Sequence, residues 1–281
     1  MRAGWDPLAA LFHFGTKDAA ILQGVDAETF DAGLERRAES DPPPPPVKKP
    51  VGRGTSLPAR PFVGEFARVL LDRRTWRGFG RRAMTRTELG TLLHLTFGYQ
   101  MSGRTQGGEV LFKTSPSGGA CHPIEAYVLA LRVRGLARAL YHYSPQTRRL
   151  HAVRPVASPE LTNAYLPGQS WYAEAGAVVL MTAVLPRVWW RYPGARSYRA
   201  ILLDAGHVCQ TFCLVATWLG LAPFCTMALG DSHIERDLGI DGVGEVALYA
   251  AGVGSRPPDG RWVQWPGHRP VPGRPRPSSN R

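Results

Sequence analysis

The run of prolines at 41–54 limits the possible fold more than any other feature of this sequence. It reads DPPPPPVKKPVGRG. Consecutive prolines hold a polyproline II path and lack backbone N–H donors, so the run cannot lie inside a helix or a sheet. We therefore predict a linker over 41–60 that separates an N-terminal segment, 1–40, from the main core.

A second boundary lies near the C-terminus. Residues 257–281 are rich in proline and arginine and end in a polar stretch. Such a segment cannot bury enough apolar surface to fold alone, so we predict a partly disordered tail. The main domain is then 61–256, and the chain, at 281 residues and 44% apolar, supplies ample material for its core.

The net charge of +12 is unevenly distributed. Residues 1–41 carry −4, residues 42–60 carry +4, residues 61–254 carry +7 and residues 255–281 carry +5. A net charge of +9 therefore lies in residues 42–60 and 255–281, which are almost entirely the predicted linker and tail. This distribution argues against a nucleic-acid-binding protein and favours a local basic site for a phosphate or an acidic peptide.

Several absences indicate a cytoplasmic protein. The sequence has no run of about 18 apolar residues that would span a membrane, and its N-terminus lacks the apolar core and cleavage site of a signal peptide. None of the four cysteines forms a C-x-x-C motif. In a chain of this length without an export signal, they are expected to be reduced thiols.

Apolar periodicity predicts an α+β domain. The segment at 85–98 opens with Thr85 and, three residues later, Glu88, which is the pattern of a capping box. The longest predicted helix, 197–219, ends before Gly220. Helices are predicted at 62–72, 85–98 and 197–219, and strands at 124–132, 139–144, 149–154, 176–185 and 245–253. Hairpin-connected strands mixed with helices favour α+β over a regular βαβ series.

Two chemical interpretations are disfavoured by spacing. Cys209 and Cys213, with His207 nearby, lie on one predicted helix, whereas structural zinc sites use close pairs from loops, so we predict core cysteines and no metal site. Cys121 and His122 are adjacent, and neighbours on an extended chain point to opposite sides, which disfavours a nucleophile–base pair. No phosphate-binding P-loop or complete Rossmann motif is present.

Three other features leave alternatives open. The segment 73–82, RRTWRGFGRR, is either a solvated basic loop or an anion site, in which alternating Arg73, Thr75 and Arg77 point the same way. The stripe of Asp204, His207 and Thr211 is either a satisfied polar group in the core or part of a site. The loop in TSPSGGACHPIEAY, 114–127, is either a turn before a buried histidine or a small-residue loop that lets backbone approach a ligand.

Together these segments resemble the nitroreductase-like flavoenzymes, specifically the SagB/McbC-type dehydrogenases of azole-containing peptide biosynthesis. The resemblance runs from about 62 to 256 and more weakly through LFHFGTK at 11–17. Its signposts stand in order: RRTWRGF, SPSGGACHPIEAY, the hairpin containing LYHY, the long segment containing DAGH, and a last strand ending AGVGSRP.

The resemblance implies a homodimer with FMN at the subunit interface and an α+β fold with a mixed, mostly antiparallel sheet flanked by helices. Carried over to this sequence, three groups of residues correspond to the family's flavin ligands. They are Arg73, Arg74, Thr75, Arg77 and Arg256 for the phosphate and ribityl chain, Pro116, Ser117 and Gly118 for the partner's loop, and Thr226, Met227 and Ala228 near flavin N5.

The resemblance also implies oxidation of peptide azolines to thiazoles or oxazoles, by proton abstraction and hydride transfer to FMN N5, beside cyclodehydratase partner proteins. The subgroup uses a Lys-Tyr pair for the proton, and the matching positions here are Arg191 and Tyr192. Arginine does not deprotonate at accessible pH, so Tyr192 is the better candidate base. The alternatives are an NAD(P)H-dependent nitro- or ene-reductase, another peptide dehydrogenase, and a non-catalytic flavin-binding scaffold.

Overall fold

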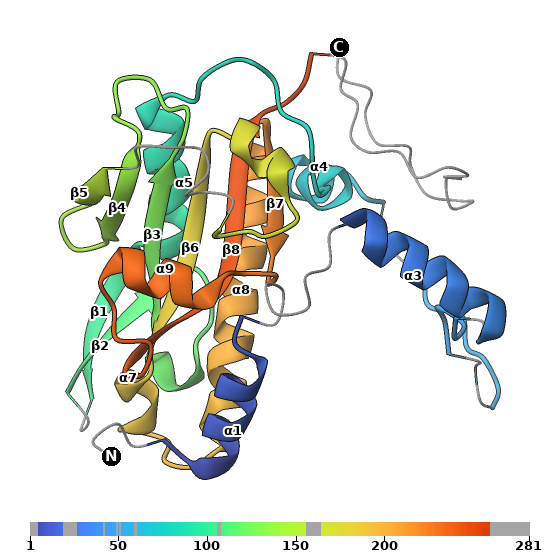
Figure 1. Ribbon diagram of the computed structural model, residues 1–281, viewed down its shortest axis with the longest axis horizontal. Coiled ribbons are helices and arrows are strands. Elements are labelled where there is room, and N and C mark those ends of the chain that lie inside the picture. Colours follow the sequence, from blue (N-terminus) through green and yellow to red (C-terminus); the bar gives the residue numbers. More distant parts are fainter. Residues whose placement is uncertain are drawn as a thin grey trace.

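The computed structural model describes residues 5–18, 27–41, 43–48, 50, 52–58, 61–105, 108–155 and 164–258. Figure 1 shows one sheet covered by helices on both faces, with α3 (Ala27–Ser40) standing apart from it. Most of the predicted tail, from 259 onward, lies outside the described residues, so the tail and the domain boundaries stay predictions.

Six strands form the central sheet in the order β5-β4-β3-β6-β8-β7, and every neighbouring pair is antiparallel. Their bounds are β3 (Ile124–Ala130), β4 (Ala139–Ser144), β5 (Arg149–Pro155), β6 (Ala177–Val184), β7 (Leu221–Thr226) and β8 (Glu245–Ser255). A separate hairpin joins β1 (Tyr99–Thr105) to β2 (Gly108–Lys113). Five of the six central strands follow the predicted ranges closely, and β7 was not predicted.

Alternating side chains of the sheet build two cores. On one face, residues such as Val128 and Val179 pack under α5 (Arg86–Phe97) and α8 (Arg196–Trp218). On the other face, residues such as Leu129 pack under α9 (Asp231–Leu238). Because successive side chains of a strand point to opposite faces, central strands of this kind must be apolar at nearly every position. Figure 1 shows α5 and α8 behind the sheet and α9 in front of it.

The start of α5 confirms the predicted capping box. The Thr85 hydroxyl accepts from the Glu88 backbone N–H at 3.1 Å, and the Glu88 carboxylate accepts from the Thr85 backbone N–H at 2.7 Å. These two bonds satisfy backbone donors that the first turn of a helix leaves free. The helix therefore begins where the sequence predicts.

The helix α8 organises the domain. By length and composition it is the one helix among the described residues that is apolar enough to cross a membrane. Half of its most apolar window is buried, and Ile201, Ala205 and Phe212 pack on the sheet. A core helix has the same character, so the sheet that α8 covers accounts for its apolarity.

Short helices surround this body. They are α1 (Pro7–Thr16), α4 (Glu65–Asp72), α7 (Pro186–Trp189), and two 3-10 helices, η1 (Gly118–Ala120) and η2 (Ser170–Glu174). Although α1 belongs to the predicted N-terminal segment, it packs on the main domain. Trp5 Nε1 donates to the Val243 carbonyl at 3.0 Å, and His13 Nδ1 lies 2.7 Å from the Tyr198 hydroxyl of α8.

Candidate functional site

The loop 115–122 is fixed on the first half of α8. The Ser117 hydroxyl donates to the Asp204 carboxylate at 2.5 Å, and the Gly118 backbone N–H donates to the same carboxylate at 3.3 Å. The Ser115 hydroxyl lies 2.6 Å from that of Thr211. Asp204 is only 4% exposed, and its burial raises the pKa of its carboxyl. The polar stripe of α8 thus holds the loop.

The loop adopts backbone angles that L-amino acids avoid. Gly119, Ala120 and His122 have φ values of 60°, 54° and 43°. Outside glycine, such left-handed conformations cost free energy and persist only where the surroundings impose them. Here the His122 backbone N–H donates to the Ser117 hydroxyl at 2.9 Å, which closes the loop on itself.

Arg191 and Tyr192, just after α7, meet this loop. Arg191 Nη1 donates to the Gly119 carbonyl at 3.1 Å. A Cβ atom on Gly119 would lie 2.5 Å from the Tyr192 hydroxyl, so this residue has to be glycine for the phenol to sit there. Tyr192 remains 42% exposed. The predicted catalytic pair and the predicted flavin loop therefore form one surface.

The Cys121–His122 pair does not have the properties of a nucleophile and its base. Burial raises the pKa of the Cys121 thiol, so the thiol form persists. Burial, together with the nearby Lys113 charge, lowers the pKa of His122 to about 4, which leaves its imidazole neutral. A protonated thiol beside a neutral histidine gives no activated nucleophile, in agreement with the sequence analysis.

The arginine segment lies along the other end of the sheet. The Trp76 backbone N–H donates to the Pro223 carbonyl of β7 at 2.9 Å, and the Gly80 N–H donates to the Ser255 carbonyl of β8 at 2.8 Å. Trp76 and Phe79 are buried and anchor the segment. Arg256, directly after β8, has its guanidinium carbon 5.6 Å from the centre of the Trp76 ring.

The arginines of this region differ in their partners. Arg74 Nη1 donates to the Leu71 and Arg73 carbonyls, so it closes the end of α4. Arg256 donates to the Leu221 and Thr217 carbonyls. In the part of the chain that the structure describes, Arg73, Arg77 and Arg256 form no ion pair with a carboxylate. This cationic set, near the buried and unpartnered Nε1 of Trp76, fits a phosphate.

The segment 226–228 follows β7. The Thr226 hydroxyl accepts from the Ala228 backbone N–H at 3.2 Å, and Gln169 Nε2 donates to the Ala228 carbonyl at 3.0 Å. Between them, Met227 is 79% exposed. These bonds make a tight turn that presents backbone to solvent at the end of β7.

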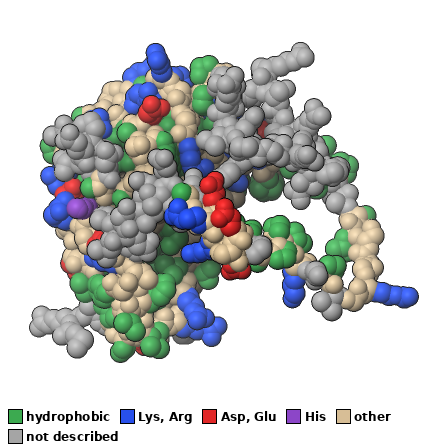
Figure 2. Space-filling view, turned by 45° about the vertical axis from the view of Figure 1, so that its right-hand side comes forward, with side chains coloured by type: hydrophobic (Ala, Val, Ile, Leu, Met, Phe, Trp, Pro, Cys, Tyr) green, Lys and Arg blue, Asp and Glu red, His purple; other side chains and the backbone are tan. Residues whose placement is uncertain are grey.

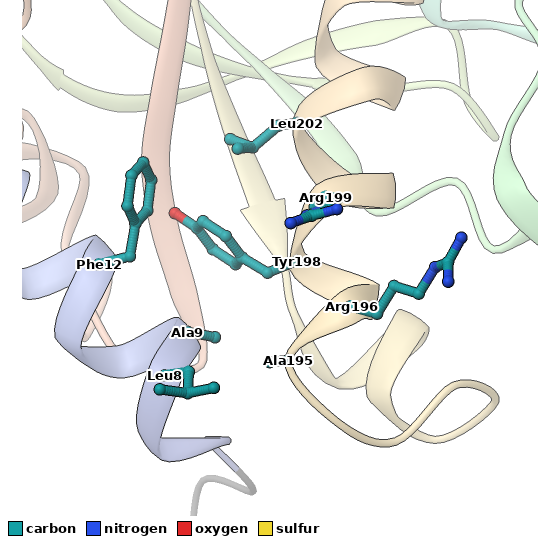
Figure 3. Close-up of a pocket in the computed structure, with 8 residues that line it drawn as sticks. All are labelled: Leu8, Ala9, Phe12, Ala195, Arg196, Tyr198, Arg199 and Leu202. Atoms are coloured by element: carbon teal, nitrogen blue, oxygen red, sulfur yellow. The ribbon is translucent and has the colours of Figure 1, made fainter.

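A pocket of about 530 Å³ separates α1 from the start of α8. Figure 3 shows Leu8 and Phe12 of α1 facing Tyr198 and Leu202 of α8, with Arg196 directed outward. Figure 2 shows apolar side chains next to Lys and Arg side chains over the lower part of the body. The pocket begins only a few residues after Tyr192, at Ala195.

The family profile called Nitroreductase matches residues 70–255, which include the arginine segment, the loop and β8. This chain belongs to the nitroreductase family. The family predicted from the order of the signposts is confirmed, and with it the α+β fold.

Two curated relatives of this nitroreductase-family chain are more than 30% identical to it over the residues that align. The trifolitoxin-processing protein TfxB of Rhizobium leguminosarum bv. trifolii is 36% identical over 149 residues, which cover 51% of this chain and 39% of that protein. The putative nitroreductase MJ1384 of Methanocaldococcus jannaschii is 32% identical over 173 residues, covering 61% and 83%. The chain therefore spans well under half the length of the trifolitoxin-processing protein.

Solved structures share the fold. The E. coli microcin synthetase McbBCD complex with truncated pro-MccB17 bound matches with a TM-score of 0.61 and 19% identity, over 79% of this chain and 81% of that one. A putative nitroreductase from Anabaena variabilis matches with a TM-score of 0.57 and 25% identity, over 68% and 38%. The fold class predicted from the sequence is confirmed.

Within one nitroreductase-family chain, the predicted site residues form two separate groups. The loop is tied to α8 at Asp204 and Thr211, whereas Arg256 is tied to it at Thr217. At 1.5 Å per residue, these anchors of the loop lie about 20 Å and about 9 Å along the helix from Thr217. The structure places Arg191 against the loop and Arg256 against Trp76, and among the described residues no hydrogen bond joins the loop to Arg256 or to the arginine segment.

Sequence reasoning missed two residues of this site. From the sequence, Asp204 is either a core residue or part of a site, and Gly119 is one of several small residues in a loop. Their roles come from partners more than 70 positions away in the chain, Ser117 for Asp204 and Arg191 for Gly119. Asp204 could have been found from the DAGH motif that it opens, because this motif and SPSGG are both among the segments that carry the family resemblance.

Proposed function

We propose that this protein is an FMN-dependent dehydrogenase that oxidises azoline rings of a ribosomally made peptide to thiazoles or oxazoles. One observation carries the proposal. A strained backbone loop, 115–122, is locked to α8 and placed directly against an exposed tyrosine, Tyr192, within a nitroreductase fold. Such a surface combines close backbone approach with a group that can carry a proton.

The chain offers a donor set for the FMN phosphate. Arg73, Arg77 and Arg256 supply guanidinium groups without carboxylate partners among the described residues, with Arg74 and Thr75 beside them. Guanidinium groups bind phosphate by charge-assisted, bidentate hydrogen bonds. Pro116, Ser117 and Gly118 in the loop, and Thr226, Met227 and Ala228 after β7, supply backbone for the ring system.

Because the loop and Arg256 are attached to different parts of α8, with anchors about 9–20 Å apart along the helix, we infer that a second copy completes each site. The outer surface of α8 supports a homodimer, since Leu203 is 63% exposed and Trp218 44%. Apolar side chains of this kind on a long helix are a usual contact surface between subunits. In such a dimer, the loop of one chain would face the arginines of its partner.

Tyr192 is the residue that we assign to proton transfer from the peptide. Arg191 donates to the Gly119 carbonyl and cannot act as a base, so we assign it to holding the loop. When bound, FMN would supply the two-electron acceptor. Because Arg191 stands where the subgroup has lysine, Tyr192 is the one member of the pair that we assign to proton abstraction.

The pocket between α1 and α8 is the surface on which we place the peptide. It combines the apolar side chains of Leu8 and Phe12 with Arg196 and Arg199, and it follows Tyr192 in the chain. Apolar contacts with flanking cations suit an extended peptide that carries acidic residues. The names of two similar proteins, a trifolitoxin-processing protein and a microcin synthetase complex, support a peptide substrate and partner proteins that modify the same peptide.

The first test uses the flavin itself. Purified wild-type protein should show flavin absorbance, and Arg73→Ala should lose most of it because a phosphate counter-charge is removed. Arg81→Ala, an exposed arginine of the same basic run, serves as the matched control and should keep flavin. A colourless wild-type protein that refuses added FMN would overturn the proposal.

The second test separates the candidate reactions. Wild-type protein with an azoline peptide and oxygen should form the aromatic ring, whereas Tyr192→Phe should keep flavin and lose turnover. Bleaching of the flavin by NADPH without peptide would instead support a nitro- or ene-reductase, the activity in the name of the relative MJ1384. Unchanged turnover in Tyr192→Phe would remove the proton role from this residue.

A further inference from the structure

Three cysteines that are far apart in the sequence converge in the core. Cys209 and Cys213 lie one turn apart on α8, and Cys225 lies on β7, the strand that α8 covers. Their sulfur atoms all lie within 4.8 Å of one another. The fourth cysteine, Cys121, belongs to the loop at the other end of α8 and takes no part in this cluster.

The sulfur positions suit a single metal ion. In a tetrahedral site with Zn–S bonds of ~2.3 Å, two sulfur atoms lie ~3.8 Å apart, so thiols within 4.8 Å of one another need to close by at most about 1 Å. Cys209 and Cys213 are 3% and 4% exposed, while Cys225 is only partly buried, which leaves a route for an ion. Isolated buried cysteines are ordinary small core residues, but three that point at one centre are a ligand set.

The surroundings match the charge of such a site. Three thiolates and one Zn²⁺ carry a net charge of −1, and the Arg73 guanidinium acts electrostatically on both Cys213 and Cys225. The Tyr249 hydroxyl interacts with the Cys225 thiol from β8. Zinc sites with three protein ligands keep a fourth position for an oxygen atom, which this hydroxyl or a water molecule can fill.

We propose that Cys209, Cys213 and Cys225 bind one Zn²⁺ ion that joins α8 to β7. Three thiolates with Zn²⁺ carry a net charge of −1, which the single Arg73 guanidinium can offset, whereas with a monovalent ion the net charge would be −2. We therefore favour zinc over a monovalent thiophilic ion. The spacing within α8 alone does not resemble a zinc motif, since the third ligand comes from the next strand. The three zinc ligands are not among the residues that we assign to the flavin or to the proton, and Arg73 is the residue that both sites would share.

The experiment uses the full chain, reduced, metal-free and without oxygen. Zn²⁺ is titrated in competition with a chromogenic chelator, and Co²⁺ serves as a spectroscopic probe whose thiolate charge-transfer bands report sulfur ligands. Wild-type protein and the control Cys121→Ala should bind one ion per chain with those bands. Cys209→Ala, Cys213→Ala and Cys225→Ala should each bind at least about tenfold more weakly, since metal affinity depends on every ligand.

A second readout covers variants that fail to fold. In wild-type protein, Zn²⁺ should slow the labelling of Cys225 by a thiol reagent, and a chelator should restore the rate, while labelling of Cys121 stays unchanged. Wild-type protein that binds no Zn²⁺ or Co²⁺, or folded variants with unchanged stoichiometry and spectra, would overturn the proposal. Equal Cys225 labelling with and without Zn²⁺ would do the same.

Discussion

Gly119 is the residue on which the candidate site closes. Its φ of 60° lies in the left-handed region, Arg191 donates to its carbonyl, and the Tyr192 hydroxyl occupies the space of a Cβ atom. Backbone conformation and side-chain packing therefore impose the same requirement at one position. Substitution of Gly119 therefore tests both requirements at once.

We expect Gly119→Ala to lower the free energy of unfolding by roughly 1–3 kcal/mol, because the left-handed conformation is strained for alanine and Tyr192 must move. Denaturant unfolding measures this change. Gly118→Ala is the control for stability, since the nearest atom to its new methyl group would be 3.8 Å away. Equal stability of the two variants would mean that the Tyr192 contact is not maintained in solution.

At the scale of single elements, neighbouring residues alone determine where α5 begins. Both capping-box hydrogen bonds at Thr85 and Glu88 are present, and Glu88 also pairs with Arg82 at 2.9 Å. Burial raises the pKa of Glu88, but the hydrogen bonds from Arg82 and Thr85 outweigh this and lower it. The first turn of α5 thus depends on one small group of side chains.

Removing the cap should destabilise the protein modestly. Thr85→Ala is expected to cost about 1 kcal/mol of unfolding free energy, the usual loss for an N-cap hydroxyl. Thr87→Ala, an exposed change within the same first turn, should cost far less. Urea unfolding of both variants gives the comparison, and a loss in Thr87→Ala as large as in Thr85→Ala would contradict the role of the cap.

The attachment of α1 should depend on pH. Burial, with the nearby Lys17 charge, lowers the pKa of His13 from 6.5 to about 4. Because this pKa is depressed in the folded protein, the stabilisation is complete above pH 6.5 and is lost as pH falls toward 4. At 1.36 kcal/mol per pKa unit, the loss is at most about 3 kcal/mol.

Amide hydrogen exchange over Pro7–Thr16 at pH 7 and pH 5, corrected for intrinsic rates, measures this effect. The amides of α1 should lose protection at pH 5 in wild-type protein. In His13→Gln the difference between the two pH values should shrink, since glutamine does not titrate in this range. Protection that is identical at both pH values in wild-type protein would show that α1 is held by other contacts, such as the ion pair of Lys17 with Glu235.

At the scale of the whole molecule, α8 separates the two groups of site residues. The loop is bound to its middle, at Asp204 and Thr211, and Arg256 is bound to its end, at Thr217. In a two-fold dimer, a residue i of one copy contacts residue j of the other, and j contacts i in return. Such a dimer would bring the loop of one copy to the arginine segment of the other, and the reverse. The proposed activity is then a property of two chains together.

Mixing two inactive variants tests this arrangement. Tyr192→Phe and Arg73→Ala should each be inactive, but co-refolded equal mixtures should regain about a quarter of wild-type activity, because half of the dimers are mixed and one of their two sites is intact. Turnover of an azoline peptide with added FMN is the measurement. A mixture no more active than its components would place both residues in the same copy of the site.

The sequence by itself determined the elements whose signals are local. Apolar periodicity gave α8 and five strands of the sheet, the Thr85–Glu88 pair gave the start of α5, and the order of motifs gave the family. β7 was missed because its six residues follow the helix directly and include Pro223, a residue that usually argues against a strand. As the edge strand of the sheet, β7 can hold that proline.

Only the tertiary structure decided which distant side chains meet. It joined Ser117 to Asp204, set Tyr192 against Gly119, and added Cys225 to the pair of cysteines on α8. It also separated the two groups of predicted flavin residues along one helix. The physical reason is that hydrogen bonds, sterics and ligand geometry act over a few ångströms in space, while sequence patterns record only neighbours within a turn or a strand.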